Sequence, residues 1–208
     1  MIAATRLLRP GTALSLVALL LQACAAPPPP PPDTSQGAGF SRAMAAYRVA
    51  DYDTALTEFR PLAEGGMAAA QFRLGTMYEN GRGLPRDLDA ARDWYTRAAA
   101  QGYSGALYSL GYVCYIQSDG ACAVEWWTRA AARASADAMF SLGVLYDEGT
   151  AMPRDPVQAH MWYDLAAAAG AAGAAEKRDA LAQGMSAAEV AEAQARARAW
   201  QGGAGASL

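Results

Sequence analysis

Residues 67–102, MAAAQFRLGTMYENGRGLPRDLDAARDWYTRAAAQG, decide the fold of this chain. Leu74 and Tyr78 lie at helical spacing on one face of the first half. The glycines around Gly81 end that helix, because glycine readily takes the left-handed conformation of a helix cap. Asp87 then offers a side-chain oxygen as the N-cap of a second helix. The stretch therefore predicts a helix, a Gly/Pro loop and a second helix.

The same unit recurs twice further along the chain. A Leu-Gly pair marks each first helix and a pair of aromatic residues marks each second helix. Self-similarity with a period of about 30 to 40 residues indicates a solenoid of stacked units. The repeated pairs are Leu74-Gly75, Leu110-Gly111 and Leu142-Gly143, and then Trp94-Tyr95, Trp126-Trp127 and Trp162-Tyr163.

This pattern, A-x-x-x-LG-x-x-Y-x-x-G-x-G-x-P-x-D-x-x-x-A-x-x-WY-x-x-AA-x-x-G, resembles the Sel1-like repeat, a relative of the tetratricopeptide repeat. The resemblance implies an all-α fold, a right-handed α-solenoid of helix pairs with helical caps. It also implies a scaffold or adaptor rather than an enzyme. The predicted solenoid spans residues 40–200, with an N-terminal capping unit at 40–66, repeats at 67–102, 103–134 and 135–170, and a C-terminal helical cap at 171–200.

The C-terminal cap carries its own start signal. Ser186 followed by Glu189 predicts a capping box at the start of the last helix. Trp200 is the expected anchor at the end of that helix. The glycine-rich residues 201–208 are predicted to be a disordered tail.

The middle unit departs from the pattern in an informative way. Its loop is four residues shorter than in the other two repeats and lacks the Pro-Arg-Asp turn. Cys114 and Cys122 flank this short loop. An exported protein meets oxidising conditions, so we expect a Cys114–Cys122 disulfide that joins the two helices of the unit. The alternatives are two small buried thiols or, less in keeping with the spacing, a redox-active pair.

The N-terminal residues have the pattern of an export signal. Residues 1–23 have two arginines and then a short apolar run, the pattern of a signal peptide. Leu21-Gln22-Ala23-Cys24 resembles the bacterial lipobox, which implies that Cys24 carries lipid, palmitate included, and anchors the chain to the membrane. The alternative is an ordinary signal peptide. Residues 24–39 form a linker with six prolines, which adopt an extended helix and are expected to act as a stiff spacer. The alternative is that they are a ligand for a proline-binding module. The resemblance to Gram-negative lipoproteins implies that Ala25, which is not Asp, directs the chain to the outer membrane, so we expect an outer-membrane lipoprotein of the bacterial cell envelope, facing the periplasm.

The composition and motifs do not indicate nucleic-acid binding, a metal site or catalysis. The net charge of −3 gives no basic footprint for nucleic acid. The one histidine, His160, is expected at a half-exposed helix position, and it has no second ligand at metal-binding spacing. We therefore predict no catalytic residue, no metal and no cofactor.

Binding of another protein is the function that the residues favour. The first helices of a solenoid usually line its concave surface. Tyr112 and Tyr115 place aromatic side chains where the neighbouring repeats have Thr76 and Glu79, and exposed tyrosine is typical of interfaces. The alternative for both is packing between units. Positions on this surface that packing does not require are Gln71, Arg73, Glu79, Ser109, Tyr112, Tyr115 and Asp147, whereas Tyr108 is expected in the core.

We thus predict a monomeric, non-catalytic scaffold, anchored in the envelope, that binds an unidentified protein partner through its concave surface. The predicted binding residues are Arg73, Glu79, Tyr112, Tyr115 and Asp147. The alternative is a cell-envelope enzyme or binder that acts on peptidoglycan or β-lactams.

Overall fold

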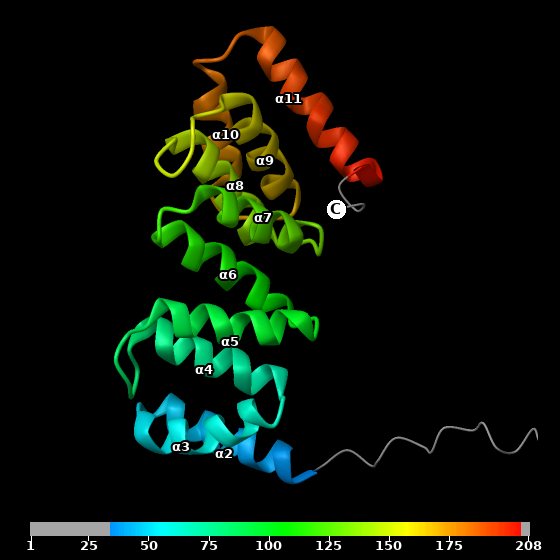
Figure 1. Ribbon diagram of the computed structural model, residues 1–208. Helices are drawn as coiled ribbons and strands as arrows, with labels where there is room; N and C mark the ends of the chain where they lie inside the picture. The colour runs from blue at the N-terminus through cyan, green and yellow to red at the C-terminus, as the bar shows by residue number, and fades with distance from the viewer. Residues whose placement is uncertain (1–33, 205–208) are drawn as a thin grey trace, which may run out of the picture. The chain divides into compact units, whose positions relative to one another are not determined.

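The computed structural model describes residues 34–204, and all regular structure in that range is helical (Figure 1). The predicted signal peptide, Cys24 and the six prolines lie outside the described residues. The helices are α2 (Thr34–Arg48), α3 (Tyr52–Glu64), α4 (Ala68–Asn80), α5 (Leu88–Ala100), α6 (Ser104–Ile116), α7 (Gly120–Ala131), α8 (Ala136–Glu148), α9 (Pro156–Ala168), α10 (Ala174–Ala182), α11 (Ala187–Ala199) and the π-helical turn η1 (Trp200–Ala204).

The helices pack in chain order. From α3 to α9 each helix lies against the next, and both α10 and α11 lie against α9. Figure 1 shows the pairs α4/α5, α6/α7 and α8/α9 following one another between α2/α3 and the two C-terminal helices. The predicted all-α solenoid of helix pairs is confirmed. Within residues 34–204, no helix is both long and apolar enough to cross a membrane.

A glycine on each first helix lets an aromatic ring of the second helix lie directly on its backbone. A Cβ atom at Gly75 would stand 2.7 Å from the ring of Tyr95, and one at Gly111 would stand 2.3 Å from the indole of Trp127. Gly143 has the same relation to Tyr163, at 2.5 Å. These distances are far below a van der Waals contact. The repeated Leu-Gly pair therefore sets how closely the helices of each unit approach.

The two long loops share one set of contacts. In the first, Gly81 ends α4 in the left-handed conformation, with φ of 64°, and Asp87 caps α5 by accepting hydrogen bonds from two backbone N–H groups. Between them, Arg86 donates from Nε to the carbonyl oxygen of Glu79 at 2.9 Å. Arg154 makes the corresponding bond to the carbonyl of Asp147 at 2.8 Å. The Pro-Arg-Asp turn thus ties the end of one helix to the start of the next.

The short loop of the middle unit uses different contacts. Asp119 caps α7 by accepting from the backbone N–H of Cys122, 3.0 Å away. Cys114 near the end of α6 is joined to Cys122 by a disulfide. This bridge links the two helices where the Pro-Arg-Asp turn is missing.

Both ends of the helical region differ from the predicted bounds. The helix α2 begins at Thr34, whereas the sequence predicted linker as far as residue 39. The last proline of the linker is Pro32, and the next proline is Pro61, so no missing backbone N–H prevents a helix from starting at Thr34. At the other end, η1 follows α11 as far as Ala204, with a kink at Gly203, whose φ is 106°, so the first residues of the predicted disordered tail form a turn.

Candidate functional site

An aromatic hollow of about 230 Å³ lies on the face formed by the first helices. We call it the first-helix hollow. Tyr112 is 40% exposed at its rim, and within the described residues only Val49 is another exposed large apolar side chain. The sequence predicted Tyr112 and Tyr115 here, and the structure brings both to the same hollow. Its lining comes from α6, α7 and α8 and consists of Tyr108, Tyr112, Tyr115, Trp127, Phe140, Ser141 and Val144.

The contribution of α8 was missed by the sequence interpretation. Val144 occupies the position of Tyr112 in the next repeat, and Phe140 occupies that of Tyr108. Aligning the repeats by their Leu-Gly pairs would have placed these residues beside one another, because successive first helices line one face. The hollow is therefore formed between two units.

Tyr115 differs from Tyr112 in its contacts. Its ring lies 5.8 Å from the indole of Trp127, centroid to centroid, and its hydroxyl donates to Glu148 at 3.1 Å. Tyr115 is half-buried and links two units. Its packing is thus enough to explain the aromatic residue at this position, while Tyr112 has an exposed ring.

The charged residues predicted for binding are partly engaged within their own units. The carboxylate of Glu79 accepts the hydroxyl hydrogen bond of Tyr95 at 2.5 Å. Burial, with Glu79 adding to it, raises the pKa of Tyr95, so this hydroxyl stays protonated. Asp147 forms an ion pair with Arg154 at 2.9 Å. Arg73 is half-buried beside the ring of Phe72, and its Nε has no hydrogen-bond partner. Their use by a partner stays a prediction.

Gln71 is not a free surface residue, as the sequence had suggested. It is buried, donates to the carbonyl oxygen of Ala63 at 3.1 Å and accepts from the side-chain amide of Gln101 at 2.7 Å. Its side chain therefore joins α3, α4 and the end of α5. One of these partners, Ala63, belongs to the preceding unit, and a pattern within one unit does not show that contact.

The expectation of a half-exposed His160 is wrong. The side chain is only 2% exposed, and its Nδ1 has no hydrogen-bond partner. Burial lowers the pKa of His160, against the opposing effect of Asp164. An ion pair between Asp164 and Arg178 of α10 lies beside it, with a distance of 2.9 Å. Because α10 packs on α9, this helix covers a ring that the last repeat alone would expose.

Within the part of the chain that the structure describes, no three His, Cys, Asp or Glu side chains gather as they would around a metal ion. The first-helix hollow is apolar and aromatic, with hydroxyl groups at its rim. Such a surface can bury an apolar or aromatic side chain and offer it hydrogen bonds.

The family model of the Sel1 repeat matches residues 68–103, 104–135 and 136–170. The chain is a Sel1 repeat protein. Proteins of this family commonly mediate protein–protein interaction and are generally non-catalytic scaffolds.

Solved structures and curated proteins agree with the family. The crystal structure of a Sel1 repeat protein from Oxalobacter formigenes is similar, with a TM-score of 0.56 and 28% identity over 70% of this chain and 60% of that one. A sel1-like repeat-containing protein, L21, of Acanthamoeba polyphaga mimivirus is 48% identical over 46 residues, 22% of this chain. The chitin synthase regulator SKT5 of Malassezia restricta is 50% identical over 40 residues, 19% of this chain. The matched segments cover only 9% and 3% of these two curated relatives.

Proposed function

We propose that this Sel1 repeat protein is a non-catalytic scaffold of the bacterial cell envelope that binds another protein through the first-helix hollow. The observation that carries the proposal is Tyr112, an exposed aromatic ring at the rim of a hollow lined by Tyr108, Tyr115 and Phe140. Tyrosine at such a place gives a large contact area at a small cost in side-chain entropy. The hydroxyl groups add hydrogen bonds at the edge of the contact.

Capture from an envelope extract of the source bacterium tests the binding surface. Wild-type protein is compared with Tyr112→Ala, because this exposed side chain can be removed without opening the core. Val49→Ala is the matched control, since Val49 is also exposed but lies on the loop after α2. We expect a discrete protein that binds wild type and Val49→Ala and is lost with Tyr112→Ala. A partner that binds all three equally places the site elsewhere, and the absence of any partner contradicts the scaffold.

The anchor is the second half of the proposal. We infer lipidation at Cys24 and an outer-membrane address from the lipobox-like segment, Leu21 to Cys24. Labelling of cells with radioactive palmitate, followed by membrane fractionation, tests it. Wild type should carry label and sediment with the outer membrane, and Cys24→Ser should lose both properties. Label on the Cys24→Ser variant would contradict the anchor.

A further inference from the structure

The opposite face of the solenoid, formed by the second helices, carries a tryptophan at the same position of each repeat. Trp162 on α9 is almost fully buried, because Trp200 covers it with an edge-to-face contact of 4.8 Å between ring centroids. Trp126 on α7 is only half-buried, and the guanidinium of Arg129 lies 4.6 Å from its ring centre. The same position is thus covered by the chain itself in one repeat and left accessible in another.

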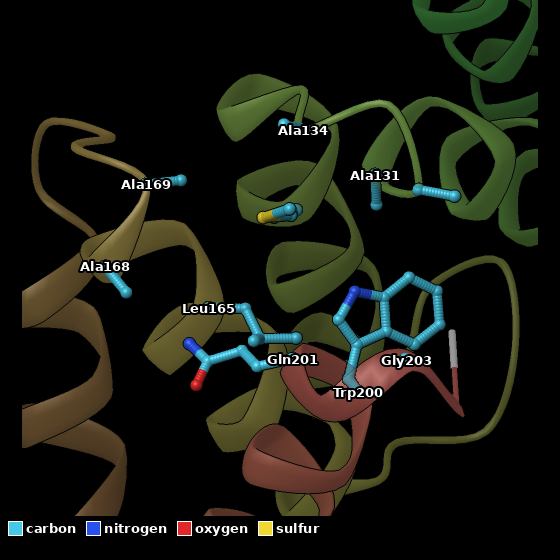
Figure 2. Close-up of a pocket in the computed structure, with 10 residues that line it drawn as sticks. Ala131, Ala134, Leu165, Ala168, Ala169, Trp200, Gln201 and Gly203 are labelled. Atoms are coloured by element: carbon cyan, nitrogen blue, oxygen red, sulfur yellow. The ribbon is translucent and has the colours of Figure 1, made fainter. Parts of the chain in front are cut away.

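Trp200 lies in the groove between α7 and α9. Figure 2 shows its indole near Ala131, at the end of α7, and Leu165 of α9. The indole borders one hollow of about 360 Å³ here and a second of about 380 Å³ beside Trp162. The groove between these two repeats therefore binds an indole side chain that lies at the end of a helix.

The preceding groove, between α5 and α7, repeats this arrangement. Its hollow of about 460 Å³ is bordered by Ala99, Leu107 and Ala132. These residues correspond, repeat by repeat, to Ala131, Met139 and Ala168 around Trp200. Within residues 34–204, no side chain takes the place of Trp200 in this hollow. We call it the open groove.

Two positions distinguish the open groove from the filled one. Arg129 stands where the filled groove has Leu165, and Arg133 stands where it has Ala169. Both arginines are exposed. Arg129 pairs with Glu125 at 2.7 Å, whereas Arg133 donates to the carbonyl of Gly102 and has no described carboxylate within ion-pair distance. The open groove therefore has an apolar floor and a basic rim.

The basic rim selects among possible occupants. The last turn of α11 carries Arg196 and Arg198 directly before Trp200. In the filled groove, Leu165 and Ala169 border Trp200, Gln201 and Gly203, whereas Arg196 borders Met161 and Trp162. By the repeat correspondence, Arg129 and Arg133 therefore face the residues at and after the aromatic side chain, and residues 201–203 of a second copy offer them no carboxylate. A segment with carboxylates beside its aromatic residue has the complementary charge.

We propose that the open groove is a second docking site, distinct from the first-helix hollow, for a partner helix that presents a large aromatic side chain flanked by acidic residues. The aromatic ring takes the place that Trp200 has in the filled groove and packs on Trp126. The flanking carboxylates pair with Arg129 and Arg133. The chain's own C-terminal helix thus shows how the partner binds, and the two arginines specify the partner's charge.

A peptide based on residues 186–203, SAAEVAEAQARARAWQGG, is the probe. The acidic form carries Gln201→Glu and Gly203→Glu, at the places that face Arg129 and Arg133 by the repeat correspondence, and the native form keeps Gln201 and Gly203. Fluorescence anisotropy of each labelled peptide is titrated with the full chain at low salt. We expect the acidic peptide to bind, with affinity lowered about tenfold or more by Trp200→Ala in the peptide. Absence of binding by the acidic peptide overturns the proposal, and tighter binding of the native peptide replaces it with self-association.

A second test reverses the charge of Arg129 and Arg133, which are exposed, so the change should not prevent the protein from folding. The double variant Arg129→Glu/Arg133→Glu should lose the acidic peptide, because its rim is now negative. Arg48→Glu/Arg60→Glu is the matched control, with the same change in net charge at exposed positions of the first helix pair. Equal binding of the acidic peptide by both double variants would show that the open groove is not its site. The outcome does not depend on Tyr112, so this test and that of the first-helix hollow can fail separately.

Discussion

Trp127 donates its indole N–H to the backbone carbonyl of Tyr108, 3.0 Å away, in the only repeat that has tryptophan at this position. The equivalent residue of the preceding repeat, Tyr95, donates its hydroxyl to Glu79 instead. The residue equivalent to Glu79 in the middle repeat is Tyr115. The middle repeat therefore differs at both positions of this pair: it has Trp127 in place of Tyr95 and Tyr115 in place of Glu79.

A double-mutant cycle tests this pairing. Trp127→Tyr alone should lower the free energy of unfolding, because its hydroxyl would lie half-buried without an acid to accept its hydrogen bond. Adding Tyr115→Glu should recover part of the loss, with a coupling of about 0.5–3 kcal/mol measured by urea unfolding. Trp127→Tyr combined with the distant Asp87→Ala is the control and should be additive within about 0.5 kcal/mol. Additivity of the first pair would show that the two exchanges are independent.

Gly111 tests the close approach of the helices. A methyl group there would stand 2.3 Å from the Trp127 indole, so Gly111→Ala should lower the free energy of unfolding by about 1–3 kcal/mol even though alanine favours helix. At Gly37 in α2, a Cβ atom would meet nothing within 4 Å. Gly37→Ala should therefore be neutral or stabilising by up to about 1 kcal/mol. Thermal unfolding of both variants measures the difference, and an equal change in stability for the two would contradict the packing argument.

Local signals in the sequence were sufficient for helix ends. The cap of Asp87 on α5 and the capping box of Ser186 and Glu189 on α11 are confirmed. Each depends on residues two or three apart along the chain, so the sequence contains all the partners. The left-handed cap at Gly81 is predictable for the same reason.

Burial set by other units could not be read from one repeat. The period shows that Trp126 and Trp162 are equivalent, but it does not show that α11 covers only the second. His160 is buried because α10 packs on α9, and no motif announces this contact. The first-helix hollow is an intermediate case, since its tyrosines depart from the repeat pattern while its other wall comes from α8.

The Cys114–Cys122 bridge is tested by thiol counting. With Cys24→Ser in the full chain, the denatured, non-reduced protein should show no reactive thiol, and two would rule the bridge out. Reduction should lower the free energy of unfolding by about 2–3 kcal/mol, because the short closed loop restricts the unfolded chain. Cys114→Ala/Cys122→Ala should show the lower stability with or without reductant.

His160 should make stability depend on pH. Burial lowers its pKa below the ordinary 6.5, so the unfolded chain takes up a proton that the folded chain does not. The free energy of unfolding should therefore fall as the pH drops below about 6.5 and should level off below the folded pKa. Urea unfolding between pH 8 and pH 5 measures this. His160→Leu removes the titrating group, and an unchanged slope in that variant would assign the pH dependence to other groups.

Trp200 should hold the C-terminal helix in place without supporting the rest of the solenoid. In a stack whose units contact only their neighbours, loss of one contact is felt mainly next to it. Trp200→Ala removes the cover of Trp162 and should cost about 1–3 kcal/mol, less than a fully buried tryptophan because Trp200 is half-exposed. Hydrogen exchange should show α11 losing protection, while α4 and α5 keep theirs. Trp200→Phe is the matched control and should retain most of the protection, since a smaller ring can still meet Trp162 edge to face. Uniform loss of protection along α4 to α11 would show instead that the solenoid unfolds as one unit and that the contact of Trp200 between α7 and α9 supports the whole stack.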